Sequence, residues 1–138
     1  MTFSEHTEPT EAIVCIGANC GDRKRNVCDG LRWLSGILSG FRHSSVYFTQ
    51  DCHGSQKVYM NAVGVGYTCM HTLELERNCK EYELACGRDS EARAVGDVPV
   101  DIDLVVFGGE VLREKDYRSE FFLKGYREIK DILSDSSD

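Results

Sequence analysis

Several features are scarce in this chain of 138 residues, and each absence narrows the class of protein. No apolar run approaches the roughly 20 residues that cross a bilayer, and no basic-then-apolar signal segment opens the chain. The 16 Lys and Arg residues are outnumbered by 23 Asp and Glu, which gives a net charge of −7. Because a nucleic-acid backbone needs a positive surface, we do not expect nucleic acid as a partner. Because the chain shows neither a spanning run nor a signal segment, we do not expect a membrane partner.

The chain also lacks the cysteine spacing that is typical of a metal cluster or a disulfide framework. Its 7 cysteines are an odd number, and no CxxC or CxxH pair occurs. Several stand at apolar positions, where cysteine packs as a small hydrophobic residue. We therefore expect reduced thiols and a cytoplasmic location.

What is present is the composition of one globular domain, with 41% hydrophobic and 28% charged residues. We expect this domain at 12–133, between a flexible leader at 1–11 and a flexible tail at 134–138. Apolar patterning predicts strands, helices and connecting polar loops. The expected strands are 12–17, 44–49, 58–68 and 98–107, with a short hairpin return at 110–113. One helix is expected after residue 22, a second after residue 72, and a final helix that includes residue 122. Polar loops are expected at 50–57 and 90–97.

This order predicts an α/β (α+β) fold, a ferredoxin-like βαββαβ sandwich with an antiparallel sheet. Such a sandwich carries its helices on one face of the sheet and leaves the other face free to bind a ligand. Asp22 is a candidate N-cap for the first helix, and Thr72 for the second. Gly87 is well placed to end the second helix.

Two aspartates interrupt the apolar strand VPVDIDLVVF at 98–107. Because side chains alternate along a strand, Asp101 and Asp103 share one face, while Ile102 and Leu104 point to the other. The two carboxylates, roughly 6–7 Å apart at Cα, can share hard divalent cations. A sheet face open to water is the plainer explanation, because paired carboxylates on such a strand are also common. The spacing alone leaves both interpretations open.

Five segments in sequence order resemble the motifs of one enzyme family. They are IVCIGANCGD at 13–22, SVYFT at 45–49, YMNA at 59–62, ELACGR at 83–88 and DIDLVVFG at 101–108. Over roughly 12–129 the chain is similar to 6-hydroxymethyl-7,8-dihydropterin pyrophosphokinase, as a divergent member with a short carboxyl end. This resemblance implies transfer of diphosphate from ATP to a reduced pterin in folate biosynthesis, with two Mg²⁺ ions. We expect small-molecule substrates and a monomer.

The resemblance also implies roles for individual residues. The catalytic residues would be Arg88, Asp101 and Asp103, with the two aspartates holding the Mg²⁺ ions. The pterin would be bound by Thr49, Tyr59, Asn61 and Phe121. The nucleotide would be bound by Glu83, Arg88 and Leu104.

Each of these roles has a plainer alternative. Tyr59 can be a packing aromatic, Glu83 a solvated helix residue, and Arg88 a partner of a helix dipole. Asn61 is harder to explain in this way, because Asn is depleted from strands and a buried amide needs hydrogen-bond partners.

The chain departs from the family pattern mainly at positive charges. Val98 stands where the family carries an arginine before the first aspartate, and residues 116–122 lack its Pro-His segment. An active enzyme would have to recruit other cations, for which the candidates are Arg93, Arg113, Lys115 and Arg118. A second hypothesis is a catalytically impaired relative that binds a pterin, a nucleotide or a protein. A third is a structural domain whose sheet face dimerises.

Overall fold

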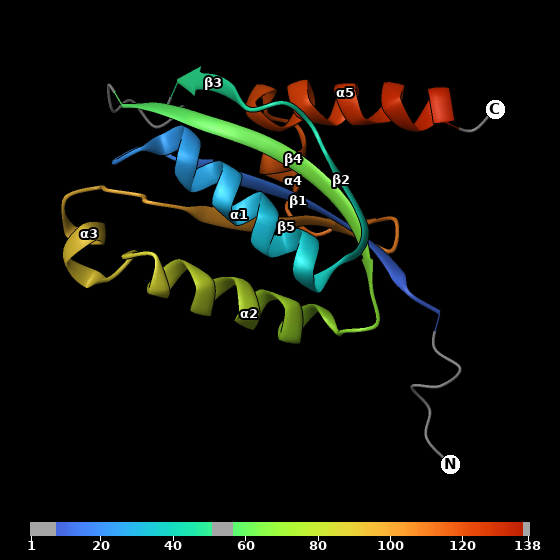
Figure 1. Ribbon diagram of the computed structural model, residues 1–138, viewed down its shortest axis with the longest axis horizontal. Coiled ribbons are helices and arrows are strands. Elements are labelled where there is room, and N and C mark those ends of the chain that lie inside the picture. Colours follow the sequence, from blue (N-terminus) through green and yellow to red (C-terminus); the bar gives the residue numbers. More distant parts are fainter. Residues whose placement is uncertain (1–7, 51–56, 137–138) are drawn as a thin grey trace, which may run out of the picture.

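The structure is a computed structural model that describes residues 8–50 and 57–136, with side chains as far as Ile132. Figure 1 shows one sheet between two layers of helices. The elements are β1 (Thr10–Ala18), α1 (Arg23–Ile37), β2 (Ser39–His43), β3 (Tyr47–Gln50), β4 (Val58–Thr68), α2 (Thr72–Ala85), α3 (Ser90–Ala94), β5 (Asp101–Phe107), β6 (Glu110–Val111), α4 (Glu114–Tyr117) and α5 (Glu120–Ser136).

The sheet is antiparallel, and its strand order is β2-β4-β1-β5-β6. The strand β3 also pairs with β4, so that β2 and β3 follow one another along the same edge. The central strand β1 is apolar on both faces and buried from Ala12 to Ala18, as its uninterrupted apolar sequence predicts. The predicted ferredoxin-like α/β fold is confirmed.

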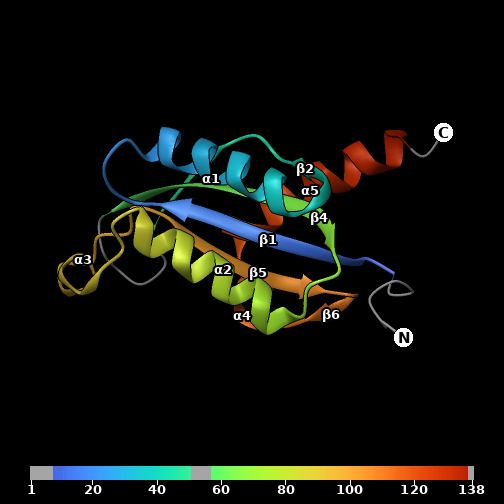
Figure 2. The same ribbon diagram turned by 60° about the horizontal axis from the view of Figure 1, so that its bottom comes forward.

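Two helices, α1 and α2, cover one face of this sheet, side by side in Figure 2. The helix α1 begins at the predicted cap, where Asp22 accepts a hydrogen bond from the Arg25 amide at 3.2 Å. Its buried residues Val27, Leu31 and Leu34 recur at helical spacing and pack on β1, β4 and β5.

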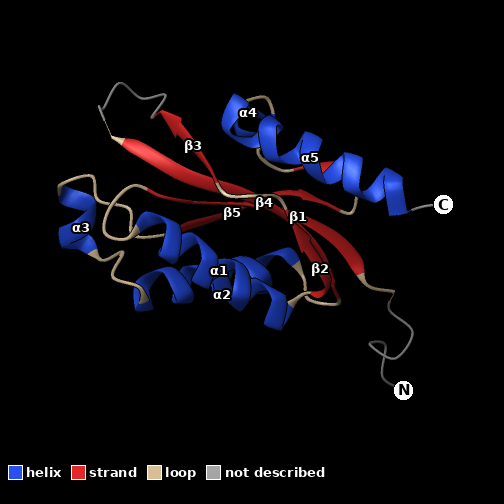
Figure 3. Cartoon of the chain, turned by 45° about the horizontal axis from the view of Figure 1, so that its top comes forward, coloured by secondary structure: helices blue, strands red, loops and turns tan. Residues whose placement is uncertain are grey.

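The opposite face is not free of helices, contrary to the expectation from the sequence. Figure 3 shows α4 and α5 on the side of the sheet away from α1 and α2. Phe122 and Ile129 of α5 pack against Val63, Val65 and Val105 of the sheet. The helix was predicted, but a strictly one-sided arrangement does not hold, because this apolar stripe needs a second apolar face to cover it.

Polar contacts also hold α5 on β3 and the residues before it. The Tyr47 hydroxyl donates to the Phe121 carbonyl and accepts from the Gly125 amide at 3.2 Å. The Glu128 carboxylate accepts from the amide and the hydroxyl of Ser45, at 2.8 and 2.9 Å. These bonds fix the position of the start of α5 over the sheet.

The other differences from the predicted elements are local. The strand β2 and the short helices α3 and α4 were not predicted, and α3 lies within the expected loop 90–97. The N-cap of α2 is His71 rather than Thr72. Gly87, with φ +102°, follows the end of α2 as predicted. The strand β1 begins within the expected leader and α5 runs past residue 133. Residues 51–56 of the expected loop, 1–7 of the leader and 137–138 of the tail lie outside the described residues.

No disulfide joins the six cysteines within the described ranges, which are Cys15, Cys20, Cys28, Cys69, Cys79 and Cys86. In the same ranges, the structure contains no helix with both the length and the apolar character needed to cross a bilayer.

Candidate active site

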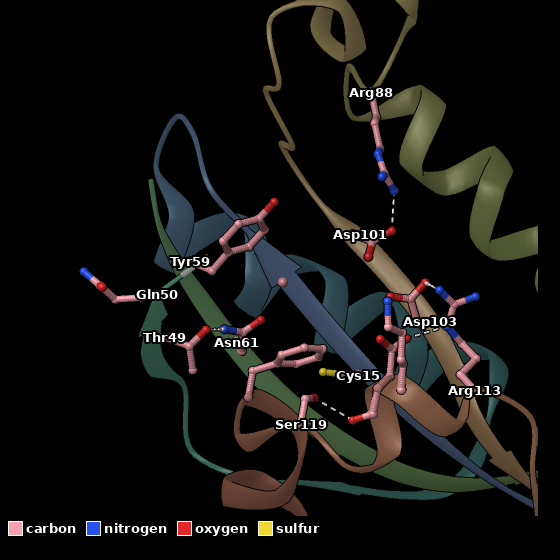
Figure 4. Close-up of a pocket in the computed structure, with 14 residues that line it drawn as sticks. Cys15, Thr49, Gln50, Tyr59, Asn61, Arg88, Asp101, Asp103, Arg113 and Ser119 are labelled. Carbon is pink, nitrogen blue, oxygen red and sulfur yellow. Dashed lines mark hydrogen bonds and ion pairs between the residues drawn. The ribbon is translucent and has the colours of Figure 1, made fainter. Parts of the chain in front are cut away.

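The helix α5 covers only part of its sheet face, and the uncovered part is a pocket of about 570 Å³. Residues at one end of three neighbouring strands pack under α5, as Ile13, Val65 and Val105 do. The same faces of these strands continue into the pocket through Gly17, Asn61 and Asp101. The lining residues, most of them labelled in Figure 4, are Cys15, Gly17, Thr49, Gln50, Tyr59, Asn61, Arg88, Asp101, Asp103, Arg113, Lys115, Asp116, Ser119 and Phe121.

One wall of the pocket carries an amide and an aromatic ring. Asn61 on β4 donates its amide N–H to the Thr49 hydroxyl on the adjacent β3, which fixes the orientation of the amide group. The Tyr59 hydroxyl accepts from Asn19 Nδ2 at 3.2 Å. The structure thus brings together three residues that the sequence predicted to bind one substrate.

Gly17 leaves the space beside Asn61 open. It pairs with Asn61 on one side and with Asp101 on the other, so it lies between the two walls. A Cβ atom at Gly17 would lie 2.5 Å from Asn61 Oδ1, closer than real Cβ contacts allow. The glycine is therefore needed for the present position of the amide.

The opposite wall carries the two aspartates, on one face of β5 as predicted, while Ile102 and Leu104 are buried on the other. Burial raises the pKa of the Asp103 carboxyl well above its ordinary value, and the hydrogen bond and negative charge shared with Asp101 raise it further. Burial opposes ionisation of Asp101 as well, but the hydrogen bond from Asp103 and the charge of Arg88 lower its pKa. Of the two carboxyls, Asp101 is thus the more readily ionised and Asp103 the more readily protonated.

Arg88 is held between two carboxylates. Its Nη1 donates to Asp101 at the pocket and to Glu83 Oε1 at 3.0 Å behind it. Glu83 is only 1% exposed and also accepts the Ile102 amide at 2.8 Å, so it joins α2 to β5. The Arg88 Nε atom is buried and has no hydrogen-bond partner among the described residues. A buried donor without an acceptor is costly, which makes this atom a candidate contact for a bound anion.

A second arginine reaches the pocket from the segment before α4. Arg113 Nε lies 2.5 Å from Asp116 Oδ2, and its Nη2 lies 3.9 Å from Asp103 Oδ1. Lys115 also lines the pocket. Of the four cations proposed from the sequence, Arg93 and Arg118 are not among the lining residues, and Arg118 pairs with Glu114 at 3.3 Å.

Comparisons with known proteins identify the family to which this architecture belongs. The profile of 7,8-dihydro-6-hydroxymethylpterin-pyrophosphokinase matches residues 13–131. The chain belongs to this pyrophosphokinase family.

Curated plant proteins are similar to this member of the pyrophosphokinase family. A folate synthesis bifunctional protein of Arabidopsis thaliana is 31% identical over 110 residues, which are 78% of this chain and 23% of that protein. A mitochondrial folate synthesis bifunctional protein of the same plant is 32% identical over 109 residues, 78% of this chain and 20% of that protein. Its counterpart from Pisum sativum is 30% identical over 105 residues, 74% of this chain and 20% of that protein. The chain thus spans about a fifth of the length of these relatives.

The other positions predicted from the pyrophosphokinase pattern lie around the pocket or away from it. Phe121, at the start of α5, lines the pocket beside Ser119. Glu83 lies behind Arg88 rather than in the lining. Leu104 is 4% exposed and packs in the core on the opposite face of the sheet, so the structure does not bring it to the pocket. The backbone of Val98 is bonded to Asn19, whose Oδ1 accepts the Val98 amide at 2.7 Å.

Several lining residues were missed as site residues by the motif comparison. Cys15 and Gly17 lie within the motif segment 13–22, and Gln50 directly follows the segment 45–49. Asp116 and Ser119 lie in a segment where the pyrophosphokinase pattern is lost. Burial, and then the charge of Asp103, raise the pKa of the Cys15 thiol. The thiol therefore stays neutral and contributes an uncharged surface beside the aspartates.

The donor set of the pocket fits a hard cation that shares its ligands with a bound phosphate. No cluster of three or more His, Cys, Asp or Glu side chains able to hold a metal exists in the described part of the chain. Asp101 and Asp103 offer two carboxylates, both partly exposed to the pocket. Mg²⁺ is commonly held in this way, by one or two carboxylates, water and substrate phosphates.

Proposed function

We propose that this chain transfers diphosphate from ATP to the hydroxymethyl group of 6-hydroxymethyl-7,8-dihydropterin in folate biosynthesis. Membership of the pyrophosphokinase family and the folate synthesis names of its relatives support this assignment. One observation carries it. The amide wall of Asn61 and the carboxylate wall of Asp101 and Asp103 face one pocket, separated by Gly17.

The amide wall suits the flat, polar ring of a pterin. Asn61 would hydrogen-bond the edge of the ring, with its orientation kept by Thr49. Tyr59 and Phe121, which line the same pocket, would pack on the ring faces. These contacts would position the hydroxymethyl group toward the aspartates.

The carboxylate wall suits the phosphates of ATP together with Mg²⁺. Asp101 and Asp103 would hold the metal, which when bound supplies charge neutralisation and orientation of the reacting phosphate oxygens. Arg88, Arg113 and Lys115 would bind the non-bridging oxygens and so compensate for Val98. Positioning and charge stabilisation carry most of a phosphoryl-type transfer, so no general base is assigned.

The proposal is tested by measuring AMP release from ATP in the presence of the pterin and Mg²⁺. We expect release by the unmodified protein and a loss of roughly a hundredfold or more in Asp101→Ala, since one such group is commonly worth that much. Glu114→Gln is a suitable control, because Glu114 is exposed, pairs only with Arg118 in the described structure and lies outside the pocket. Absence of AMP release at high protein concentration would refute the proposed activity.

A second candidate function is binding of the same ligands without turnover. It is favoured by Val98, which removes a cation that the family places before the first aspartate, and whose amide is tied to Asn19. Calorimetry with the pterin and a non-hydrolysable ATP analogue separates the two functions. Binding without AMP release would support the second function.

A further inference from the structure

The two arginines of the pocket are held in the same way. Arg88 lies between Asp101 and Glu83, and Arg113 lies between Asp103 and Asp116. Each arginine therefore has one partner from the aspartate pair and one carboxylate outside that pair.

The two outside carboxylates, Glu83 and Asp116, have contacts that do not depend on the aspartate pair. Glu83 is buried and bonded to the Ile102 amide of β5, so it remains in place whatever the pocket contains. Asp116, on α4, lies 2.5 Å from Arg113 Nε, whereas the Asp103 contact of the same arginine is longer, at 3.9 Å. Arg88 and Arg113 thus each have an anchor, Glu83 and Asp116 respectively, that can be kept while the contact to the aspartate pair is broken.

A divalent cation and the two guanidinium groups compete for the oxygens of Asp101 and Asp103, because all of them are positively charged. A cation bound to Asp101 and Asp103 would repel guanidinium groups at the same oxygens. An arginine that donates to a carboxylate has fewer N–H groups left for a phosphate. The buried Arg88 Nε, which lacks a partner among the described residues, shows that this arginine is not fully satisfied by its present contacts.

We propose that the pocket works by exchange of partners. In the ligand-free state Arg88 pairs with Asp101, and Arg113 lies beside Asp103. When a divalent cation takes the aspartates, both arginines turn to the oxygens of the polyphosphate and remain attached to their anchors. Cation and polyphosphate then bind with positive coupling, because each removes an obstacle to the other. Arg113 becomes a phosphate-binding residue of this chain, and Glu83 and Asp116 become positioning residues.

This inference rests on the proposed function for the identity of the cation and the anion, but its test does not require turnover. The probe is inorganic tripolyphosphate in EDTA, titrated calorimetrically into the metal-free protein. Replacing a metal-binding carboxylate would release the arginine it holds. We therefore expect Asp101→Asn and Asp103→Asn to bind tripolyphosphate roughly tenfold more tightly than the unmodified protein, the size of one charge-assisted hydrogen bond. Equal or weaker binding by both variants overturns the exchange.

Loss of one negative charge raises anion affinity by itself, so two controls are needed. Glu114→Gln removes a charge next to Arg113 in the sequence without touching either arginine, and we expect a change of less than about twofold. In a double-mutant cycle, Arg113→Gln should weaken binding more in the Asp103→Asn background than alone. Additive effects would overturn the exchange in favour of a general effect of charge.

Asp103→Asn alone carries the test if Asp101→Asn does not fold. AMP release by the unmodified protein separates this inference from the proposed function. If the unmodified protein releases AMP but the variants do not bind tripolyphosphate more tightly, the proposed activity stands and the exchange is refuted. Tighter, non-additive binding without release supports the exchange and refutes the activity.

Discussion

The two pocket aspartates are chemically identical but have different surroundings. The Asp101 carboxylate forms an ion pair with Arg88. The cation beside Asp103 is Arg113, which is 3.9 Å away and lies closer to Asp116. The same neutral substitution should therefore have opposite effects on stability at the two positions. Removing one partner of a well-made buried pair destabilises, whereas removing one of two crowded like charges relieves repulsion.

Asp103→Asn should stabilise the metal-free protein, increasingly so at higher pH. Burial, Asp101 and Asp116 raise the pKa of Asp103, and Arg113 only partly opposes them. Between the unfolded pKa, about 4, and the raised folded pKa, the folded state binds the additional proton, so stability falls as pH rises. The Asp103→Asn variant has no carboxyl group at this position, so its stability does not fall with pH for this reason. We expect its advantage in urea unfolding in EDTA to grow with pH, to on the order of 1–3 kcal/mol.

Asp101→Asn is the matched comparison for this prediction. Its unfolding free energy should fall below that of the unmodified protein at neutral pH, because Arg88 and the buried Glu83 lose a partner in their network. Equal shifts at the two positions would contradict the assignment of Asp101 as the more readily ionised member of the pair. With Mg²⁺ and nucleotide present, both variants should lose binding.

Gly17 offers a test of the amide wall at the level of one residue. In Gly17→Ala the new methyl group would displace Asn61 Oδ1, 2.5 Å away, and with it the amide that Thr49 orients. We expect the KM for the pterin to rise roughly tenfold, the cost of misplacing one hydrogen-bonding group, with a smaller change in the KM for ATP. Steady-state kinetics measure both values. Equal rises in the two KM values would place the effect outside the amide wall.

At the scale of elements, two helical glycines, Gly36 in α1 and Gly125 in α5, have different surroundings. Nothing lies within 4 Å of a Cβ built at Gly36 in α1, whereas one at Gly125 in α5 would lie 2.7 Å from Val63 Cγ2 and from Tyr47 Oη. Gly36→Ala should stabilise by roughly 0.5–1 kcal/mol through helix propensity. Gly125→Ala should destabilise by about 1–3 kcal/mol, because α5 must move off the sheet. Urea unfolding of the two variants decides this, and a stabilising Gly125→Ala would show that α5 is not closely docked.

The long elements were predictable because their patterns are strong and local. The apolar run of β1, the helical spacing in α1 and the alternation in β4 each determine an element with little help from the rest of the chain. The strand β2, with the sequence SGFRH, has no alternation of its own and exists through pairing with β4. The face chosen by α5 depends on Val63 and Val105, which are distant in sequence.

The site was predictable where it lies within the sheet and not where it depends on packing. Asp101 and Asn61 follow from strand alternation and family motifs, and the structure brings both to one pocket. The lining role of Arg113, rather than Arg93, follows from the position of α4 on the same side of the sheet as α5, which no motif encodes. Leu104 shares a motif with the aspartates, but alternation directs it to the other face.

At the scale of the whole molecule, both helical layers depend on one strand. In β1, Val14 and Ile16 pack under α1 and α2, while Ile13 and Cys15 pack under α5. Loss of either layer would expose one full face of the central strand. We therefore expect the described domain to unfold as a single cooperative unit rather than layer by layer.

Cys15 and Cys79 report on the two layers separately, since Cys15 lies under α5 and Cys79 is buried with α2 on the opposite face. Alkylation at increasing urea, read by mass spectrometry, should label the exposed Cys69 and Cys86 without urea. Burial raises the pKa of the Cys15 thiol, and it raises the pKa of the Cys79 thiol to about 12. Both shifts suppress reaction in the native state. We expect both to become reactive at one urea midpoint. Earlier labelling of Cys15 would show that α5 detaches first, and that the pocket opens before the domain unfolds.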